Sequence, residues 1–194
     1  MKLLDLIKLH GEPQVLLDGW NENYMPKAIW DFEDIFMINS NGKAILNDLE
    51  IPGDPFDIFQ KILNKWKNNG NELAAIGYMS YDLKNFLYPH LNFKPIKRLT
   101  PLLWFANPNK ILPYEIIHDD DETNSIDSSL IKNIPNPKNY EKSINMIKAY
   151  LAQGDSYQIN FTQPKKYQIK GNPFDIYLSM REKIKPNCGM YVNL

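Results

Sequence analysis

The first third of the chain alternates short apolar runs with turn residues, a pattern typical of β-strands joined by tight turns. Residues 15–19 and 34–38 are two such runs. The second leads to Asn41-Gly42, which accepts the positive φ angles of a tight primed turn, so residues 43–46 are expected to return as the partner strand. Residues 73–80 have the character of a buried strand.

Three segments carry helical signals. Residues 54–70 open with an Asp-Pro cap, continue with apolar positions at helical spacing and stop at Asn-Gly. Residues 140–151 place apolar side chains at steps of four, three and four, and Gly154 supplies a permissive end. Asn172 precedes a proline and caps a third helix that runs to about Lys183.

The remaining patterned segments predict strands. In residues 157–162 aromatic and aliphatic side chains alternate with Gln, Asn and Thr, which is the period of a half-exposed strand. Residues 102–106 and 114–117 form two apolar runs within a proline-punctuated stretch. Residues 190–194 are apolar up to the end of the sequence, as expected for a chain that is cut inside a domain.

A change of composition separates two regions. The stretch 118–134 contains DDDETNSIDSS, which is too polar to bury a core and is expected to be a linker. We therefore divide the chain into a domain at 1–118, an acidic polar linker at 119–136 and an incomplete second domain at 137–194. The four acids of 119–122 could be imagined as a cation site, but adjacent carboxylates diverge, so a solvated linker is the preferred interpretation.

Short strands, tight turns and only three helices favour an α+β fold. Parallel βαβ units would need a helix between most strand pairs, so we expect antiparallel sheets.

Composition excludes several functional classes. The chain has 194 residues and 22 Lys+Arg against 23 Asp+Glu, which gives a formal net charge of -1. Interleaved charges of both signs give no positive field for nucleic acid or anionic lipid. The single cysteine, Cys188, excludes a disulfide and a Cys-pair zinc site. The N-terminus lacks the apolar core of a secretory signal, and no apolar run approaches about 18 residues, so a cytoplasmic location is expected.

Apart from any resemblance to a known family, the sequence shows no recognisable set of catalytic residues. No nucleophile elbow, P-loop, dinucleotide fingerprint or zinc-helix motif is present. Cys188 has no histidine near it in sequence and is better interpreted as an ordinary thiol than as a nucleophile. Tyr78 and Tyr81 flank Ser80, with Asp82 behind them. They could line a pocket, although their periodicity favours core aromatics at a strand end.

Residues 148–162, KAYLAQGDSYQINFT, carry the most specific motif. This run resembles the opening of the chorismate-binding domain that anthranilate synthase component I, aminodeoxychorismate synthase component I, isochorismate synthase and salicylate synthase share. The positions that match the core of the motif are Gly154, Asp155, Tyr157, Gln158, Asn160 and Thr162. We expect these residues to support, structurally, a site that is formed elsewhere. For Gln158, Asn160 and Thr162, the polar face of a sheet strand is the simpler role.

A weaker resemblance extends upstream. Residues 77–83, GYMSYDL, are similar to a strand and turn of the family's N-terminal domain, and residues 15–19 occupy the place of its early apolar strand. The Tyr-Asp-Leu form and the absence of a clear Leu-Leu-Glu-Ser motif look more like aminodeoxychorismate synthase component I than anthranilate synthase component I. The family also implies an antiparallel sandwich with outer helices.

The resemblance implies a function for the full-length enzyme. There, ammonia from a glutamine amidotransferase subunit replaces the 4-hydroxyl of chorismate with Mg²⁺ bound, toward p-aminobenzoate and folate. The family's acid/base residues, lysine nucleophile and magnesium ligands belong to sequence beyond position 194. This chain alone is therefore expected to be inactive, with no catalytic or metal-binding residue of its own. A non-catalytic module that binds an amino acid or the amidotransferase is the alternative.

The resemblance also implies a small amino-acid pocket, which holds tryptophan in the family, between the early and the last strand. Its candidate lining is Asp18, Gly19, Tyr24, Cys188, Gly189 and Met190. The family's Pro-x-Pro segment is altered here to Lys-Pro-Asn-Cys-Gly, which favours simple packing of the two strands instead.

Overall fold

The computed structural model describes residues 1–19, 25–70, 72–93, 100–116, 131–134, 139–162 and 166–193. The chain divides into two compact units. Unit 1 comprises Met1–His118 and Pro186–Leu194, and unit 2 comprises Asp119–Lys185. In the described residues, no helix is long and apolar enough to cross a membrane.

Within the described part of unit 1, seven strands form one sheet in which every strand pair is antiparallel. The strands are β1 (Val15–Asp18), β2 (Lys27–Ile38), β3 (Ala44–Leu46), β4 (Leu49–Ile51), β5 (Ile76–Met79), β6 (Leu103–Pro113) and β9 (Gly189–Val192). The path is β4-β3-β2-β1-β9, with β6 against β2 and β5 against β6. Antiparallel pairing confirms the α+β prediction at this level, and a sandwich of two sheets stays a prediction.

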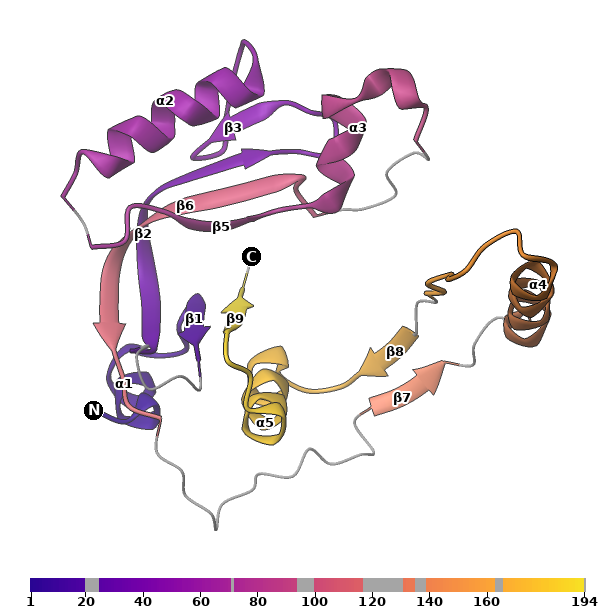
Figure 1. Ribbon diagram of the computed structural model, residues 1–194. Coiled ribbons are helices and arrows are strands. Elements are labelled where there is room, and N and C mark those ends of the chain that lie inside the picture. Colours follow the sequence, from indigo (N-terminus) through magenta and orange to yellow (C-terminus); the bar gives the residue numbers. More distant parts are fainter. Residues whose placement is uncertain are drawn as a thin grey trace. The chain divides into compact units, whose positions relative to one another are not determined.

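Strands β2 and β6 run side by side over nearly their whole length and bend together (Figure 1). The other edge of β2 is shared, because its start pairs with β1 and its end pairs with β3. Register shifts between Ile29 and Asp34 interrupt the β2–β6 ladder between these two ends. The sheet therefore has a β1 wing, with β9 outermost, and a β3 wing, which also contains β4 and β5.

Strand β6 corrects one expectation from the sequence. The first predicted run, 102–106, lies mostly within β6, which continues through Pro108, where Phe32 is its partner and the register shifts, and ends at Pro113. Residues 114–116 of the second run form only an isolated bridge at Glu115. Proline lacks a backbone donor and is tolerated at such irregularities.

The predicted hairpin at Asn41-Gly42 forms, but its loop is longer than expected. Asn39 N donates to Lys43 O at 3.0 Å and Gly42 N donates to Asn39 O at 2.9 Å. Gly42 has φ +79°, whereas Asn41 does not take a positive φ. The loop is therefore not a two-residue primed turn. It uses one left-handed glycine instead.

The primed turn lies between β3 and β4. Asn47 and Asp48 have φ angles of +48° and +66°, and they connect the paired residues Leu46 and Leu49. Two positive φ angles in a two-residue loop are the mark of a type I′ turn. Asn and Asp tolerate that conformation better than other non-glycine residues.

Helix α2 (Pro55–Lys67) confirms the predicted helix and its cap. Asp54 Oδ1 accepts hydrogen bonds from the backbone N of Phe56 and of Asp57, each at 2.9 Å. The helix packs on the β3 wing, where Phe59 stacks on Phe36 with ring centroids 5.2 Å apart. The buried core of this wing consists of Phe36, Ile38, Ala44, Phe59, Trp66, Leu83, Leu102 and Leu103.

A second buried cluster packs the β1 wing against β5. Val15, Ile29 and Ile76 form it, and Val192 of β9 packs against it. Within β9, Val192 packs against this core, whereas Met190 is 42% exposed.

Unit 1 also contains helical elements that the sequence pattern did not predict. Helix α1 (Leu3–His10) buries Leu3 and Leu6, although the charges of this segment obscured its apolar face. Three short turns follow β5: η1 (Tyr81–Leu83), α3 (Lys84–Leu87) and η2 (Pro89–Leu91).

Unit 2 contains two predicted helices, α4 (Tyr140–Gln153) and α5 (Pro173–Ile184). Gly154 ends α4 with φ +80°, as predicted. No residue of α4 is buried, although Ile144 and Ile147 of its apolar stripe are only partly exposed. β7 (Ile131–Ile134) pairs antiparallel with β8 (Lys166–Ile169). The prediction that residues 119–136 form a linker is therefore wrong for residues 131–134. These residues form a strand because β8 supplies hydrogen-bond partners for their backbone, which the local sequence pattern does not reveal.

The strand predicted at 157–162 is wrong. Residues 156–162 are described and carry no regular secondary structure. Tyr157 is 100% exposed. A strand needs a neighbour for its backbone donors and acceptors, and alternating side chains do not supply one.

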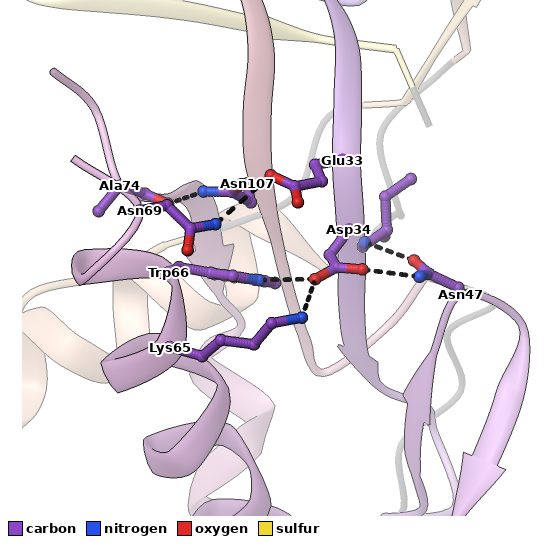
Figure 2. Close-up of polar contacts among 9 residues, drawn as sticks. Glu33, Asp34, Asn47, Lys65, Trp66, Asn69, Ala74 and Asn107 are labelled. Atoms are coloured by element: carbon purple, nitrogen blue, oxygen red, sulfur yellow. Dashed lines mark hydrogen bonds and ion pairs between the residues drawn. The ribbon is translucent and has the colours of Figure 1, made fainter. Parts of the chain in front are cut away.

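A polar cluster lies between α2 and the bend of β2 (Figure 2). Asp34 Oδ2 accepts hydrogen bonds from Trp66 Nε1 at 3.0 Å and from Lys65 Nζ at 3.4 Å. Asn47 Nδ2 donates to Asp34 Oδ1 at 2.8 Å, and Asn47 Oδ1 accepts from the backbone N of Ile35 at 2.8 Å. One carboxylate thus connects β2, α2 and the β3–β4 turn.

Two opposing effects set the pKa of Asp34. Burial raises it, but the hydrogen bonds from Trp66, Asn47 and Lys65 and the charge of Lys65 lower it, and the net pKa lies below the ordinary value of 3.8. Above the unfolded-state pKa the carboxylate is ionised in both states, so its stabilising contribution is complete there. That contribution is lost as the pH falls through the lower folded-state pKa.

Replacing Asp34 by Asn is expected to destabilise unit 1 by about 1–3 kcal/mol at pH 7, because hydrogen bonds to a charged group are weakened. The difference from wild type should begin to shrink as the pH falls below about 4, where the carboxylate of the unfolded chain takes up a proton, and it should be lost once the pH falls through the lower folded-state pKa. Urea unfolding at a series of pH values measures both effects. Asp48→Asn, in the exposed neighbouring turn, is the control, and an equal loss in both variants would contradict the prediction.

Replacing Gly77 by Ala is expected to destabilise unit 1 by about 1–3 kcal/mol through overpacking. A Cβ at this position would lie 2.0 Å from Trp104 O and 2.6 Å from Phe105 Cγ, so β5 would have to move away from β6. Hydrogen exchange should show faster exchange of the β5 amides together with the lower stability. Gly70→Ala is the comparison for strain without overpacking: nothing lies within 4 Å of its Cβ, and its φ of +72° strains only the turn after α2, so the local protection of β5 relative to β6 should not change. Unchanged protection of β5 in Gly77→Ala would refute the prediction.

Candidate functional site

The β1–β9 pair brings together most of the residues predicted for the amino-acid pocket. Asp18 pairs with Gly189 and Leu17 pairs with Met190 in the ladder. Gly19 follows Asp18 in the chain and Cys188 precedes Gly189, so both residues lie at the same end of the two strands. Tyr24, the sixth predicted residue, lies outside the described residues.

The strand ends give this site a buried side and an exposed side. Asp18 is only 2% exposed, and Gly19 is buried. Cys188 and Met190 are exposed. Gly189 lies between these extremes.

Asp18 has a partner that the sequence reasoning missed. The hydroxyl of Tyr114 donates a hydrogen bond to Asp18 Oδ1, and the two residues are 96 positions apart in sequence. Tyr114 follows the end of β6, and its backbone N donates to Pro26 O at 3.1 Å. In the sequence, Tyr114 stood out only as an aromatic residue at the start of the apolar run 114–117, which did not indicate a contact with Asp18. A buried carboxylate with a phenolic donor can also bind a cationic amino group, because such a group would offset the cost of burying the charge.

The outer strand β9 carries a tyrosine whose pKa is raised. Tyr191 OH donates to Glu12 Oε1 at 3.1 Å. Burial, the hydrogen bond to Glu12 and the charge of Glu12 together raise the pKa of Tyr191 to about 12. Tyr191 therefore stays protonated at neutral pH and acts as a donor that fastens β9 to the segment before β1.

The residues of the sequence motif surround the end of α4. Asp155 N donates to Tyr150 O at 3.0 Å, which continues the helix cap at Gly154. Ser156 Oγ then donates to Gln158 O at 3.0 Å, and Tyr140 contacts Phe161 with ring centroids 5.8 Å apart.

The polar residues of this motif lie on the surface. Gln158, Asn160 and Thr162 are all exposed. Their arrangement presents amides and a hydroxyl to solvent, without a nucleophile or a perturbed acid among them.

The residues near Ser80 do not form a catalytic group. Ser80 Oγ caps η1 by accepting a hydrogen bond from Asp82 N at 3.3 Å. Tyr78 OH donates to Pro101 O at 3.2 Å, and burial raises the pKa of Tyr78. Tyr81 is 83% exposed, so the expectation of a core aromatic is wrong for it.

The described residues do not fit a magnesium site. Among them, no three His, Cys, Asp or Glu side chains converge so that they could hold a metal ion. The acidic run at 119–122 lies outside the described residues.

Comparison with known protein families identifies one match. Residues 117–194 match the family model described as chorismate binding enzyme. No curated protein matches the chain. The matched range contains the motif segment and β9, together with Cys188, Gly189 and Met190. The match supports the assignment of residues 117–194 to the chorismate-binding enzyme family.

Proposed function

We propose that this chain supplies the N-terminal unit and the opening of the chorismate-binding unit of an enzyme that aminates chorismate. The observation that carries the proposal is the match of residues 117–194 to the chorismate-binding family, within which the motif GDSYQINFT lies. Unit 1, with its antiparallel sheet and outer helices, is compatible with the family's N-terminal domain.

Within the family, we propose aminodeoxychorismate synthase component I. Residues 81–83, Tyr-Asp-Leu, favour it, and the early strand leads into Asp18-Gly19 where the anthranilate synthases carry a Glu-Ser pair. Anthranilate synthase component I is the second candidate, and the motif of residues 148–162 suits it equally. The distinction matters chemically, because one enzyme replaces the 4-hydroxyl of chorismate whereas the other releases pyruvate to give an aromatic product.

Mg²⁺ and a glutamine amidotransferase subunit belong to this proposal as cofactor and partner of the full-length enzyme. General acid/base groups and the metal must lie within hydrogen-bonding and coordination reach of the substrate. The exposed amides of Gln158 and Asn160 are suited to supporting such a site. They do not carry a proton-transfer step themselves.

The activity prediction has two parts. The purified 194-residue chain, incubated with chorismate, ammonium and Mg²⁺, is expected to form no product above background, with or without an amidotransferase subunit. A chain extended by its downstream coding sequence is expected to form 4-amino-4-deoxychorismate, detected by mass spectrometry.

Each outcome of this experiment has a defined meaning. Anthranilate and pyruvate from the extended chain would select the second candidate. Product from the 194-residue chain would show that the catalytic residues are present in it. An extended chain that neither binds nor converts chorismate would refute the proposed function.

We also propose that the end of the β1–β9 pair binds a free amino acid, with L-tryptophan as the first ligand to test. The supporting observation is the buried Asp18 carboxylate beside Gly189, with Cys188 and Met190 toward solvent. The alternative is that these residues only pack the two strands together.

Calorimetry with millimolar L-tryptophan tests this pocket. Heat of binding is expected from the wild-type chain and is expected to be lost in Asp18→Asn, because the amino group loses its charged partner. Asp31→Asn, a substitution outside the pocket, is the control. Absence of heat with a folded wild-type sample would reject the pocket and leave strand packing as the role of these residues.

A further inference from the structure

The sequence contains two Asn-Gly pairs, Asn41-Gly42 and Asn69-Gly70. An asparagine that precedes a glycine is chemically labile, because the backbone N of a residue without a side chain can approach and attack the amide carbon of the asparagine. The attack requires a backbone N–H that is free of a hydrogen bond and a segment whose backbone can rearrange. The structure gives the two pairs different surroundings.

The Asn41-Gly42 pair is held within the β2–β3 hairpin. Gly42 N donates to Asn39 O at 2.9 Å, and Asn41 N donates to Asn39 Oδ1 at 3.0 Å. Phe86 covers the glycine, since a Cβ on Gly42 would lie 2.2 Å from Phe86 Cε1. The backbone N that would attack at this pair is therefore already engaged, and its surroundings oppose a rearrangement of the loop.

The Asn69-Gly70 pair lies in the turn after α2 and is open to solvent. Both residues are exposed. Asn69 N donates to Trp66 O at 3.2 Å, but no hydrogen bond between described residues uses Gly70 N. Nothing lies within 4 Å of the position that a Cβ on Gly70 would take. The backbone N of Gly70 is therefore available for the attack, and the turn has room to rearrange.

The side chain of Asn69 connects the end of α2 with β2 (Figure 2). Asn69 Nδ2 donates to Glu33 Oε2 at 3.4 Å, and both residues are exposed, so this bond restrains the amide only weakly. Conversion of the amide into a carboxylate would remove the donor. It would also place a second negative charge beside Glu33, and like charges at this distance repel.

We propose that Asn69 is a site of spontaneous deamidation, and that the product weakens the contact between the end of α2 and β2. Gly70 N attacks Asn69 Cγ and forms a bond to it, the Cγ–Nδ2 bond breaks, and ammonia leaves with the proton from Gly70 N. Water then opens the cyclic imide at either carbonyl. This hydrolysis returns a proton to Gly70 N and leaves aspartate or isoaspartate at position 69.

Incubation of the full chain at mildly alkaline pH, followed by proteolysis and tandem mass spectrometry, tests the site. In the folded chain, conversion of amide to acid is expected to be several times faster at Asn69 than at Asn41. In urea the two rates should converge, because neither pair is then held by the fold. Gly70→Ala should slow the reaction at Asn69 several-fold, since a Cβ hinders the attack, and should leave the rate at Asn41 unchanged.

Two results would overturn the assignment of the site. One is conversion in the folded chain that is as fast at Asn41 as at Asn69. The other is a folded chain in which neither asparagine converts although both convert in urea, because the fold would then protect Asn69 as well.

Urea unfolding tests the effect of the modification. Asn69→Asp carries the same charge as the product, and Asn69→Ala is the control that loses the donor without gaining a charge. The midpoint of Asn69→Asp is expected at a lower urea concentration than that of Asn69→Ala. When Glu33→Gln is added to both variants, this gap should close, because the new charge no longer has a carboxylate beside it. A gap of unchanged size would show that the charge does not act through Glu33 and would contradict the proposed effect.

Discussion

The β2–β6 pairing is the constraint on which the rest of unit 1 depends. These two strands form part of both wings, so the β1 wing and the β3 wing share one continuous backbone ladder. A regular ladder of this length would twist evenly, and register shifts of this kind bend a strand pair and increase its twist locally. Because the shifts fall between the two places where β2 changes neighbour, the sheet bends without breaking either wing.

Bending exposes polar groups that need partners, and the Asp34 cluster provides them. The carboxylate lies just after the irregular stretch of β2 and receives donors from α2 and from the β3–β4 turn. Nearby, Asn107 of β6 is fully buried, and its Nδ2 donates to Ala74 O at 2.6 Å. Side-chain bonds thus replace part of the hydrogen bonding that a regular ladder would supply at the bend. This is why a charged group lies beside the apolar core that α2 covers.

The sequence predicted those features that depend on neighbouring residues. The cap at Asp54, the helix end at Gly154 and the hairpin near Gly42 each follow from backbone rules that act over a few positions. Contacts between distant residues were missed, and the Asp18–Tyr114 pair, 96 residues apart, is the clearest case. The predicted strand at 157–162 failed for a related reason, because a pattern of side chains does not reveal whether a backbone neighbour exists.

The last described strand shows why sequence boundaries and structural boundaries can differ. Residues 117–194 match one family model, yet Gly189–Val192 pair with β1 and complete the sheet of unit 1. Unit 2 is therefore inserted between β6 and β9 and is connected to unit 1 by two chain segments. The backbone that carries Cys188, Gly189 and Met190 follows α5 directly, so these candidate pocket residues lie within the range that matches the family model. Any ligand that fixes the end of β9 against Asp18 would also restrain the chain that enters from α5, because only Lys185 to Cys188 separate the two elements.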